Sequence, residues 1–225
     1  KGQPVLLKTR EGRPIKVEGN ALSVTTFGGT DAQAQASVVS LYDSYRLQSA
    51  MIDGKAVEWN DFDKSLKGAL ASGEGEVVIM TPSITSPSEY TLLHEVRTKM
   101  GASHVPYDSV SFAGFAKANE ITHGVHTYSE YDFEAADVVI SFGSDFLGSH
   151  PNSVSSSKQY VARRDAKHAR GMSRHIQVEE RMSLTGSNAD YRFTRSVNDQ
   201  REILLAVLAG LTGSQSKVSE GNSDI

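Results

Sequence analysis

The 225-residue sequence contains no cysteine. Disulfides, thiolate zinc sites, cysteine-ligated iron–sulfur clusters and a cysteine nucleophile are therefore excluded within these residues. Long apolar runs are also missing: the longest, residues 203–211, is about half of the ~18 residues that a membrane helix needs. We therefore predict no direct membrane span.

An excess of positive charge is absent as well. The chain has 23 Lys and Arg against 27 Asp and Glu, a formal net charge of -4, so the basic footprint of nucleic-acid binding is missing and we expect no nucleic-acid partner. The composition, with 38% hydrophobic and 22% charged residues, is that of a globular protein with one sizeable core or one and a half domains. Because the sequence starts at Lys1 and shows no signal-peptide pattern, we expect a fragment of a longer protein.

Residues 1–60 predict a small, irregular, β-rich segment. Apolar residues 5–9 and the alternating residues 14–18 flank Glu11-Gly12, which indicates a hairpin, and a second hairpin is expected around Asp53-Gly54. A short helix capped by Asp31 is expected between them.

Residues 61–212 predict a Rossmann-like α/β domain, because short apolar strands alternate with helices of ten to sixteen residues. The fold class expected is α/β, with a doubly wound, mostly parallel sheet and helices on both faces. Asn60, Ser86-Pro87 and Gly101 supply helix start and stop signals. Residues 213–225 are expected to form a mobile polar tail. Strands are expected at residues 77–80, 104–105, 138–142, 175–178 and 191–193, with a last helix over residues 199–211.

In such sheets ligands bind beyond the carboxyl ends of the strands, which directs attention to the loops after Met80, Phe142 and Val178. The last two of these loops carry candidate ligand residues. The first of the two follows the strand over residues 138–142 and contains Gly143, Ser144, Asp145 and Gly148. Its glycines and the helix that follows suit a phosphate. It is not a P-loop, because Ser149-His150 stands where Lys and Ser/Thr belong. The alternative is a strand-to-helix turn that needs glycine for its shape.

The second loop follows the strand over residues 175–178. Glu179 could accept from ribose hydroxyls or a guanine edge, and Arg181 could meet a phosphate, although a solvated strand end has the same residues. Residues 183–190 are rich in short hydrogen-bonding side chains, as ligand loops and ordinary turns both are. The candidate ligand residues here are Ser183, Thr185, Asn188 and Asp190.

Other chemistry-bearing residues carry weaker signals. His123 and His126 have a spacing that one metal could use, but no third ligand stands at matching spacing, so we predict no metal site there. His150, expected at the mouth of the first loop, is the one histidine considered for proton transfer. Trp59, with Tyr42 and Tyr45, is expected to form a satellite core.

Five segments in order resemble the molybdopterin oxidoreductase superfamily: residues 12–20, 41–47, Trp59, 141–148 and 178–190. The His150-Pro151-Asn152-Ser153 segment and the residues from Asp31 look most like the large iron–sulfur subunit of bacterial alternative complex III, a membrane quinol:electron-acceptor oxidoreductase. In complete relatives the two loops bind the guanine-dinucleotide arm of molybdopterin.

The departures from the family pattern favour a branch that lacks this cofactor. The resemblance places the last cluster cysteine of its relatives near residues 30–35, where this chain has none. It places the metal-ligating residue near Asp108 and Ser109, whose oxygens could hold molybdenum but do not by themselves indicate it. The branch is thought to carry its iron–sulfur clusters elsewhere in the same subunit, so we expect neither cofactor nor metal in this piece.

The leading hypothesis is therefore a cofactor-free, structural domain of a respiratory iron–sulfur subunit. Its expected partners are other subunits of a membrane-bound complex, at the bacterial cell envelope on the periplasmic side. One alternative is an oxidoreductase fragment that binds molybdopterin guanine dinucleotide through the two loops. The other is a plain nucleotide-binding α/β module.

Overall fold

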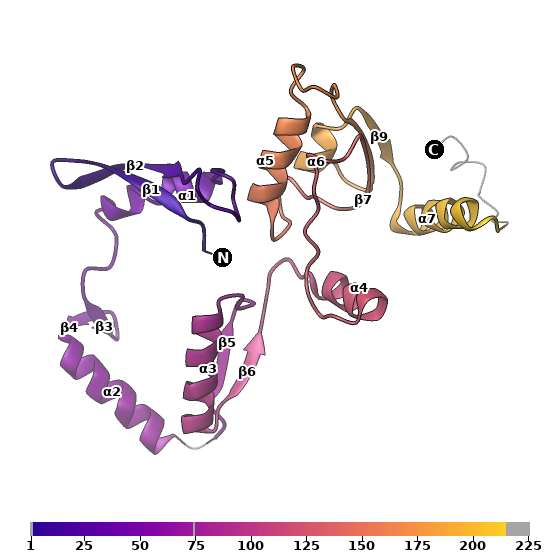
Figure 1. Cartoon of the computed structure of the whole chain (residues 1–225). Helices are drawn as coiled ribbons and strands as arrows, with labels where there is room; N and C mark the ends of the chain where they lie inside the picture. Colours follow the sequence, from indigo (N-terminus) through magenta and orange to yellow (C-terminus); the bar gives the residue numbers. More distant parts are fainter. Residues whose placement is uncertain (1, 74, 215–225) are drawn as a thin grey trace. The chain divides into compact units, whose positions relative to one another are not determined.

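The computed structural model describes residues 2–73 and 75–214, and it divides the chain into two compact units (Figure 1). The first comprises Lys1–Glu18 and Ala32–Phe112, and the second comprises Gly19–Asp31 and Ala113–Ile225. The expected domain limits at residues 60 and 212 stay predictions, and residues 215–225 of the expected tail lie outside the described residues.

Two hairpins in the N-terminal sixty residues are confirmed. β1 (Val5–Arg10) pairs with β2 (Arg13–Gly19), and β3 (Ala50–Ile52) pairs antiparallel with β4 (Lys55–Val57). Both turns have positive φ at two successive residues, 51° and 76° in the first and 50° and 76° in the second. That is the type I′ geometry, which the right-handed twist of the flanking strands favours.

The segment between the hairpins contains α1 (Ala32–Ala36) and a single 3₁₀ turn (Val39–Leu41). The Tyr42 hydroxyl donates a hydrogen bond of 2.6 Å to the carbonyl of Pro14 and so ties this segment to the first hairpin. The aromatic satellite core expected here is wrong. Trp59 is 66% exposed and Tyr45 94% exposed, because no described element covers them.

A parallel strand pair connected by a helix follows α2 (Trp59–Ser72). β5 (Val78–Thr81) pairs parallel with β6 (Ser103–Pro106), and α3 (Pro87–Met100) connects them. The Ser86 side chain accepts from the amide of Glu89, Pro87 opens the helix, and Gly101 ends it at φ 62°. These signals are confirmed. The expected cap at Asn60 is wrong, because α2 begins at Trp59 and Glu58 is in the cap position, two residues before Asn60.

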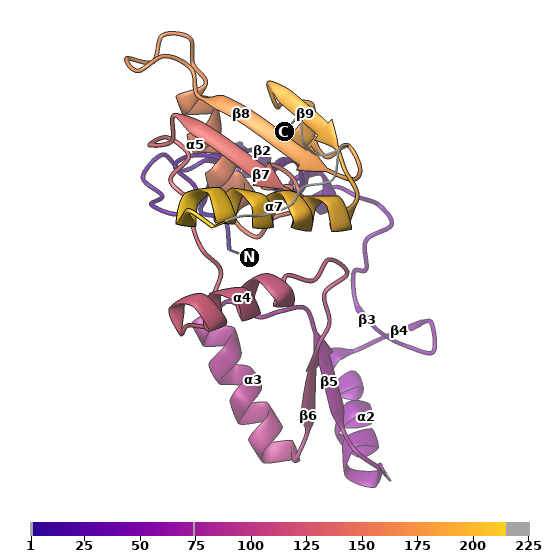
Figure 2. The same cartoon turned by 90° about the vertical axis from the view of Figure 1, so that its right-hand side faces the viewer.

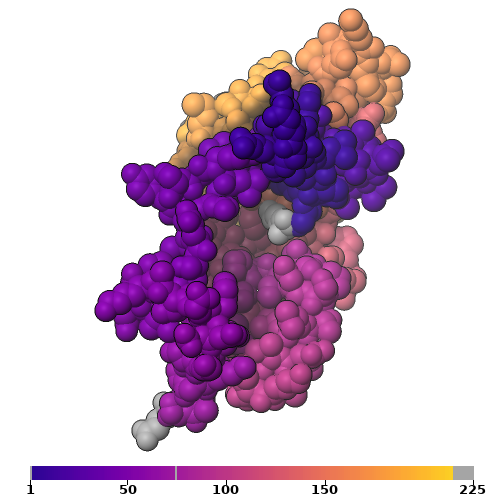
Figure 3. Space-filling view, turned by 90° about the vertical axis from the view of Figure 1, so that its left-hand side faces the viewer, coloured from indigo at the N-terminus to yellow at the C-terminus, as the bar shows by residue number. Residues whose placement is uncertain are grey.

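None of the residues of α2 is buried. Figure 3 draws the part of the chain that includes this helix in purple, in a space-filling view. Leu66 and Leu70, on one side of this helix, are 48% and 43% exposed.

The second unit is built around a three-stranded parallel sheet in the order β7-β8-β9 (Figure 2). The last helix of this unit begins at Val197, two residues before its expected start at residue 199, and Ser196 and Asp199 form a capping box at its N-terminus. The elements of this unit are α4 (Ala113–His123), β7 (Val138–Phe142), α5 (Ser153–Arg163), β8 (Arg174–Glu179), α6 (Leu184–Ser187), β9 (Tyr191–Thr194) and α7 (Val197–Thr212).

Buried aromatic rings form the core of this unit. Phe146 stacks on Phe133 with ring centroids 4.4 Å apart and meets the edge of Tyr160 at 5.7 Å. Val139 of β7 and Leu147 pack against these rings. The core therefore lies on one side of the sheet, directly beneath the loop that follows β7.

The mixed α/β class and the parallel pairing are confirmed. Within the described residues the parallel strands form separate sheets of two and three strands, and not the single sheet that the sequence predicts. None of the described helices combines the length and the apolar character needed to cross a membrane.

Candidate functional site

The two loops predicted as a ligand site lie side by side after β7 and β8. Thr185 is fully buried, and its hydroxyl and amide both donate to Asp145 Oδ1, at 2.9 and 3.1 Å. The amide of Leu147 donates in turn to Thr185 Oγ1 at 3.0 Å. The two loops are therefore in direct contact, and the contact is made by the protein's own side chains.

The glycines of the first loop make room for other parts of the protein. Asp145 Oδ2 accepts from the amide of Ser149 at 3.0 Å. A Cβ atom on Gly148 would collide with this carboxylate. Gly143 has φ 60°, and a Cβ there would lie 3.0 Å from Gln200 Oε1. The space beside both glycines is thus taken up by neighbouring side chains.

Glu179 is the most completely bonded acid of the site. It is 3% exposed and accepts from the amide and hydroxyl of Ser183 at 3.1 and 2.6 Å, from Gln177 Nε2 at 3.2 Å and from Arg192 Nε at 2.6 Å. Burial acts to raise the pKa of this carboxyl, but the hydrogen bonds from Ser183, Arg192 and Gln177 outweigh it and lower the pKa below its ordinary value. A Cβ on Gly186 would collide with Glu179 Oε1.

A polar row continues from Glu179 along the same face of β8. Gln177 Oε1 lies 3.3 Å from His175 Nε2, and His175 Nδ1 lies 3.0 Å from the Tyr160 hydroxyl, which also donates to the carbonyl of Asn188 at 2.9 Å. Burial lowers the pKa of His175 below its ordinary value, and the hydrogen bond with Gln177 opposes this shift.

Asp190 closes the second loop through an ion pair. Arg164 donates to both of its oxygens, at 2.6 and 2.8 Å, and the amide of His175 donates at 2.7 Å. The hydrogen bonds from Arg164 lower the pKa of Asp190 to about 2. The charge of Asp190 is therefore satisfied inside the protein.

The remaining candidates of the two loops have less internal bonding. The carbonyl of Ser144 accepts from Ser141 Oγ and Gln177 Nε2, and Asn188 Nδ2 donates to the carbonyl of Leu184 at 2.8 Å. Arg181 is exposed at the start of the second loop. The structure also forms the four-residue helix α6 inside this loop, which the sequence reasoning missed.

The weak metal candidates lie in the first unit, beyond the ends of β5 and β6. Asp108 accepts from the amide of Ser83 at 2.9 Å and from its hydroxyl at 2.5 Å. Its neighbour Ser109 lies in the same loop. No group of three or more potential metal-ligating side chains occurs in the described part of the chain. Asp108 therefore links the segment after β6 to the segment after β5.

The histidines have structural surroundings. His150 is 5% exposed, its Nδ1 accepts from the amide of Asn152, and its ring meets the edge of Phe115 at 5.6 Å. The histidine expected at the mouth of the first loop is therefore a buried ring that packs against Phe115. His126 pairs with Glu120 at 3.0 Å, and His123 with Thr122 at 2.7 Å.

Sequence reasoning missed the residues that hold the two loops in place: Tyr160, Arg164, His175, Gln177 and Arg192. A signal for three of the network's members is present in the strand itself. His175, Gln177 and Glu179 alternate with Ile176 and Val178, which places a polar row on one face of a buried strand. Buried polar side chains need partners, so this row predicts a network.

The bonded state of these loops does not fit a guanine-dinucleotide arm. An anionic pyrophosphate here would meet the carboxylates of Asp145 and Glu179, whose hydrogen bonds already go to the protein. The space beside Gly148 is occupied by the Asp145 carboxylate, and the space beside Gly143 by the Gln200 side chain. No protein-family model matches the chain, and a search of curated proteins finds no match. The resemblance to molybdopterin oxidoreductases therefore stays a prediction.

Proposed function

We propose that this chain is a cofactor-free structural domain, resembling the molybdopterin oxidoreductases, within a respiratory iron–sulfur subunit. The subunit that contains this domain would carry its iron–sulfur clusters in another part of its chain. That subunit would belong to a membrane quinol:electron-acceptor oxidoreductase. The complex would lie at the bacterial cell envelope, with this domain on the periplasmic side. The domain would hold neighbouring electron carriers in place, and redox chemistry would occur outside it.

The observation that carries the proposal is the internal bonding of the two candidate loops. Asp145 and Glu179, the acids best placed to contact a nucleotide, together accept seven hydrogen bonds from the protein. Opening this network for a ligand would leave buried polar groups unpaired, at a cost of about 1–3 kcal/mol for each group. A domain that retains its loops for stability, and not for binding, has this arrangement.

Exposed apolar side chains support a role inside a larger assembly. Leu204, Leu208 and Leu211 of α7 are 46%, 56% and 82% exposed. Surface of this kind is normally covered by partner subunits.

We also propose that the three-stranded sheet has the doubly wound arrangement expected from the sequence. Tyr160 of α5 bonds to His175 on one face of β8. Val178, on the opposite face by strand alternation, is completely buried, and α7 packs near this strand. Helices on both faces of a parallel sheet are what doubly wound folds require.

Metal and pterin content of the native complex tests the functional proposal. Elemental analysis and the fluorescence of oxidised pterin should detect iron but no stoichiometric molybdenum, tungsten or pterin in this subunit. Stoichiometric pterin here would overturn the proposal. It would favour the fragment that binds molybdopterin guanine dinucleotide, for which Gly148→Val should abolish cofactor retention.

A thermal-shift measurement with guanine and adenine nucleotides addresses the plain nucleotide-binding module. A nucleotide at ~100 times its dissociation constant would stabilise the fold by about 2.7 kcal/mol. We expect no shift from any of them. A concentration-dependent shift that Thr185→Val removes would contradict the proposal.

A further inference from the structure

β7 is an edge strand whose backbone is unpaired on one side. The carbonyl of Asp137 accepts from the amide of Arg174, and the amide of Gly143 donates to the carbonyl of Val178. Both groups point to β8, and backbone groups alternate between the two sides along a strand. The peptide groups of Val138, Ile140 and Phe142 therefore face away from β8, where no strand of the described chain pairs with them.

This open edge lacks the features that keep edge strands from pairing. Exposed edges normally carry lysine, proline, a bulge or an inward charge. β7 has the sequence Val-Val-Ile-Ser-Phe, with none of these, while β9 at the other edge carries Arg192. Uncharged strands rich in branched and aromatic residues are typical of the interior of a parallel sheet. The sequence of β7 is thus suited to a covered edge.

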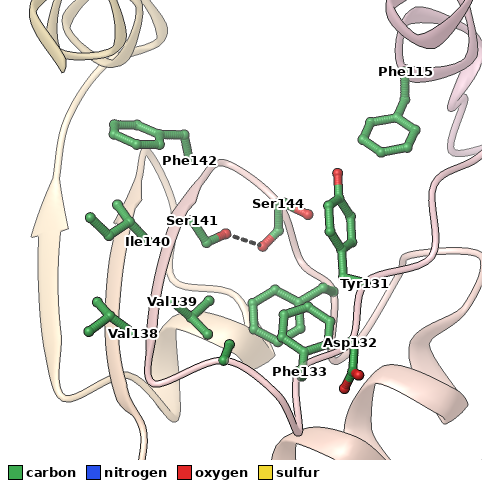
Figure 4. Close-up of a pocket in the computed structure, with 12 residues that line it drawn as sticks. Phe115, Tyr131, Asp132, Phe133, Val138, Val139, Ile140, Ser141, Phe142 and Ser144 are labelled. Carbon is green, nitrogen blue, oxygen red and sulfur yellow. Dashed lines mark hydrogen bonds between the residues drawn. The ribbon is translucent and has the colours of Figure 1, made fainter. Parts of the chain in front are cut away.

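A groove of about 510 Å³ runs along this edge (Figure 4). All five residues of β7 line it, although successive side chains point to opposite faces, so the groove follows the backbone edge. Figure 4 shows Val139 and Ser141 on the side of Tyr131 and Phe133, and Phe115 lines the groove beyond them. Its volume is that of pockets that enclose a small ligand or short peptide.

The charge around the groove is acidic. Asp132 lines it, and no Lys, Arg or His is among the twelve described residues that do so. An adjoining hollow of about 580 Å³ shares Tyr131 and Asp132, and it adds Glu130 and Glu134 against the single cation of Lys158. A segment with cationic flanks is therefore favoured here. A second copy of the chain is disfavoured, because it would bring its own acids to this rim.

We propose that the open edge of β7 is a docking site for an extended apolar segment of a partner chain, flanked by Lys or Arg, which adds a strand to the sheet. The segment's backbone would pair with Val138, Ile140 and Phe142. Its side chains would occupy the groove beside Tyr131 and Phe133, and its flanks would meet Asp132 and Glu134. This inference rests on the proposed role as a structural domain of an assembly and names the surface used.

Amide hydrogen exchange on the whole 225-residue chain tests the docking site. In the chain alone, the amides of Val138, Ile140 and Phe142 should exchange freely, while those of Val139 and Ser141, bonded to β8, should exchange slowly. A synthetic peptide of alternating Val and Thr with two Lys at each end should slow the first set at least about tenfold and leave the second unchanged. Protection of all five amides without peptide would overturn the proposal, since the chain or a second copy would then close the edge.

A pair of matched variants separates edge pairing from non-specific binding. Ile140 and Tyr191 lie on the two edge strands of one sheet and are 54% and 52% exposed. Ile140→Lys should weaken peptide binding, measured by fluorescence anisotropy, at least about tenfold, because a lysine protects an edge strand. Tyr191→Lys should bind the peptide with the same affinity as the unsubstituted chain. Equal affinity of the two variants would refute docking on β7.

Two further measurements complete the test. A peptide with Glu in place of each Lys should bind at least about tenfold more weakly, and equal binding would overturn the charge argument. Slow exchange at Val139 and Ser141 in Ile140→Lys verifies that the sheet persists. Pterin in the native subunit would defeat the proposed function without altering these results, while a protected edge would defeat the docking site alone.

Discussion

Replacing Thr185 by valine should destabilise the chain by about 3 kcal/mol, because valine keeps the shape of the side chain and removes its hydroxyl. The change deletes a charge-assisted hydrogen bond to Asp145, worth about 1.5–3 kcal/mol, and leaves the part-buried amide of Leu147 without this acceptor, at the lower end of about 1–3 kcal/mol. The amide of residue 185 still donates to Asp145, so the lower half of the summed range is expected.

Urea unfolding monitored by circular dichroism measures this effect. The midpoint should fall while the dependence on urea stays constant, since the surface exposed on unfolding hardly changes. Thr185→Ser, which keeps the hydroxyl, should lose only about 1 kcal/mol for the buried methyl group. Ser187→Ala, on the exposed side of the same short helix, should stay within about 0.5 kcal/mol.

A double-mutant cycle with Asp145→Asn identifies the partner. If the hydroxyl acts through Asp145, the two changes should be non-additive by about 1 kcal/mol or more. Unchanged stability of Thr185→Val would refute the reasoning, because a buried threonine that can lose its hydroxyl without cost is not holding the loops together.

Three further outcomes follow from the same structure. The folded pKa of Asp190 is lowered from 3.8 to about 2, so its pairing with Arg164 contributes stability that is complete above about pH 5 and is lost as the pH falls toward 2. Because this carboxyl is 35% exposed, unfolding measured as a function of pH should show a loss of about 1 kcal/mol after allowance for solvent screening. Asp190→Asn should flatten that part of the stability profile. Gly186→Ala should destabilise the chain by more than 2 kcal/mol in urea unfolding, because its methyl group would strike the buried Glu179 carboxylate. Gly12→Ala has open space around it, so it should be destabilised only by the strain of placing alanine at a positive φ. Trp59, the only tryptophan, should emit at long wavelength and be quenched freely by acrylamide in the isolated chain; emission typical of a buried ring would contradict its observed exposure.

Local signals in the sequence predicted most of the secondary structure because each acts within a few residues. Two successive positive φ values at Glu11-Gly12 make a tight turn wherever the hairpin lies in the fold. Ser86-Pro87 starts a helix, and Gly101 ends it, through the chain's own amides and carbonyls. By contrast, Asn60 was expected to cap α2 and Glu58 takes that position without a side-chain bond, because a capping preference of about 1 kcal/mol does not by itself fix the residue at which a helix begins.

The candidate site contains contacts that short-range sequence signals do not predict. The sequence directed attention to the loops after β7 and β8, and the structure brings these loops together, since the carboxyl ends of neighbouring parallel strands share one edge of a sheet. It did not indicate that Asp145 and Glu179 would turn inward to Thr185 and Ser183. An aspartate or glutamate in a loop is the same residue type whether its side chain faces solvent, a ligand or a buried hydroxyl. Only the packing of the second loop decides which of these three environments the side chain has.

The sequence by itself determined the absence of cysteine chemistry, the hairpin turns, the helix ends and the parallel βαβ order, because all of these depend on residue type or on short-range backbone geometry. Tertiary structure alone decided which residues are covered. Trp59 and the apolar face of α7 are exposed, while Thr185, His175 and Gln177 are completely buried. Burial depends on which distant segments come together, and hydrophobicity read along the chain carries no such information. For the same reason the open edge of β7 became visible only once its single strand partner was known.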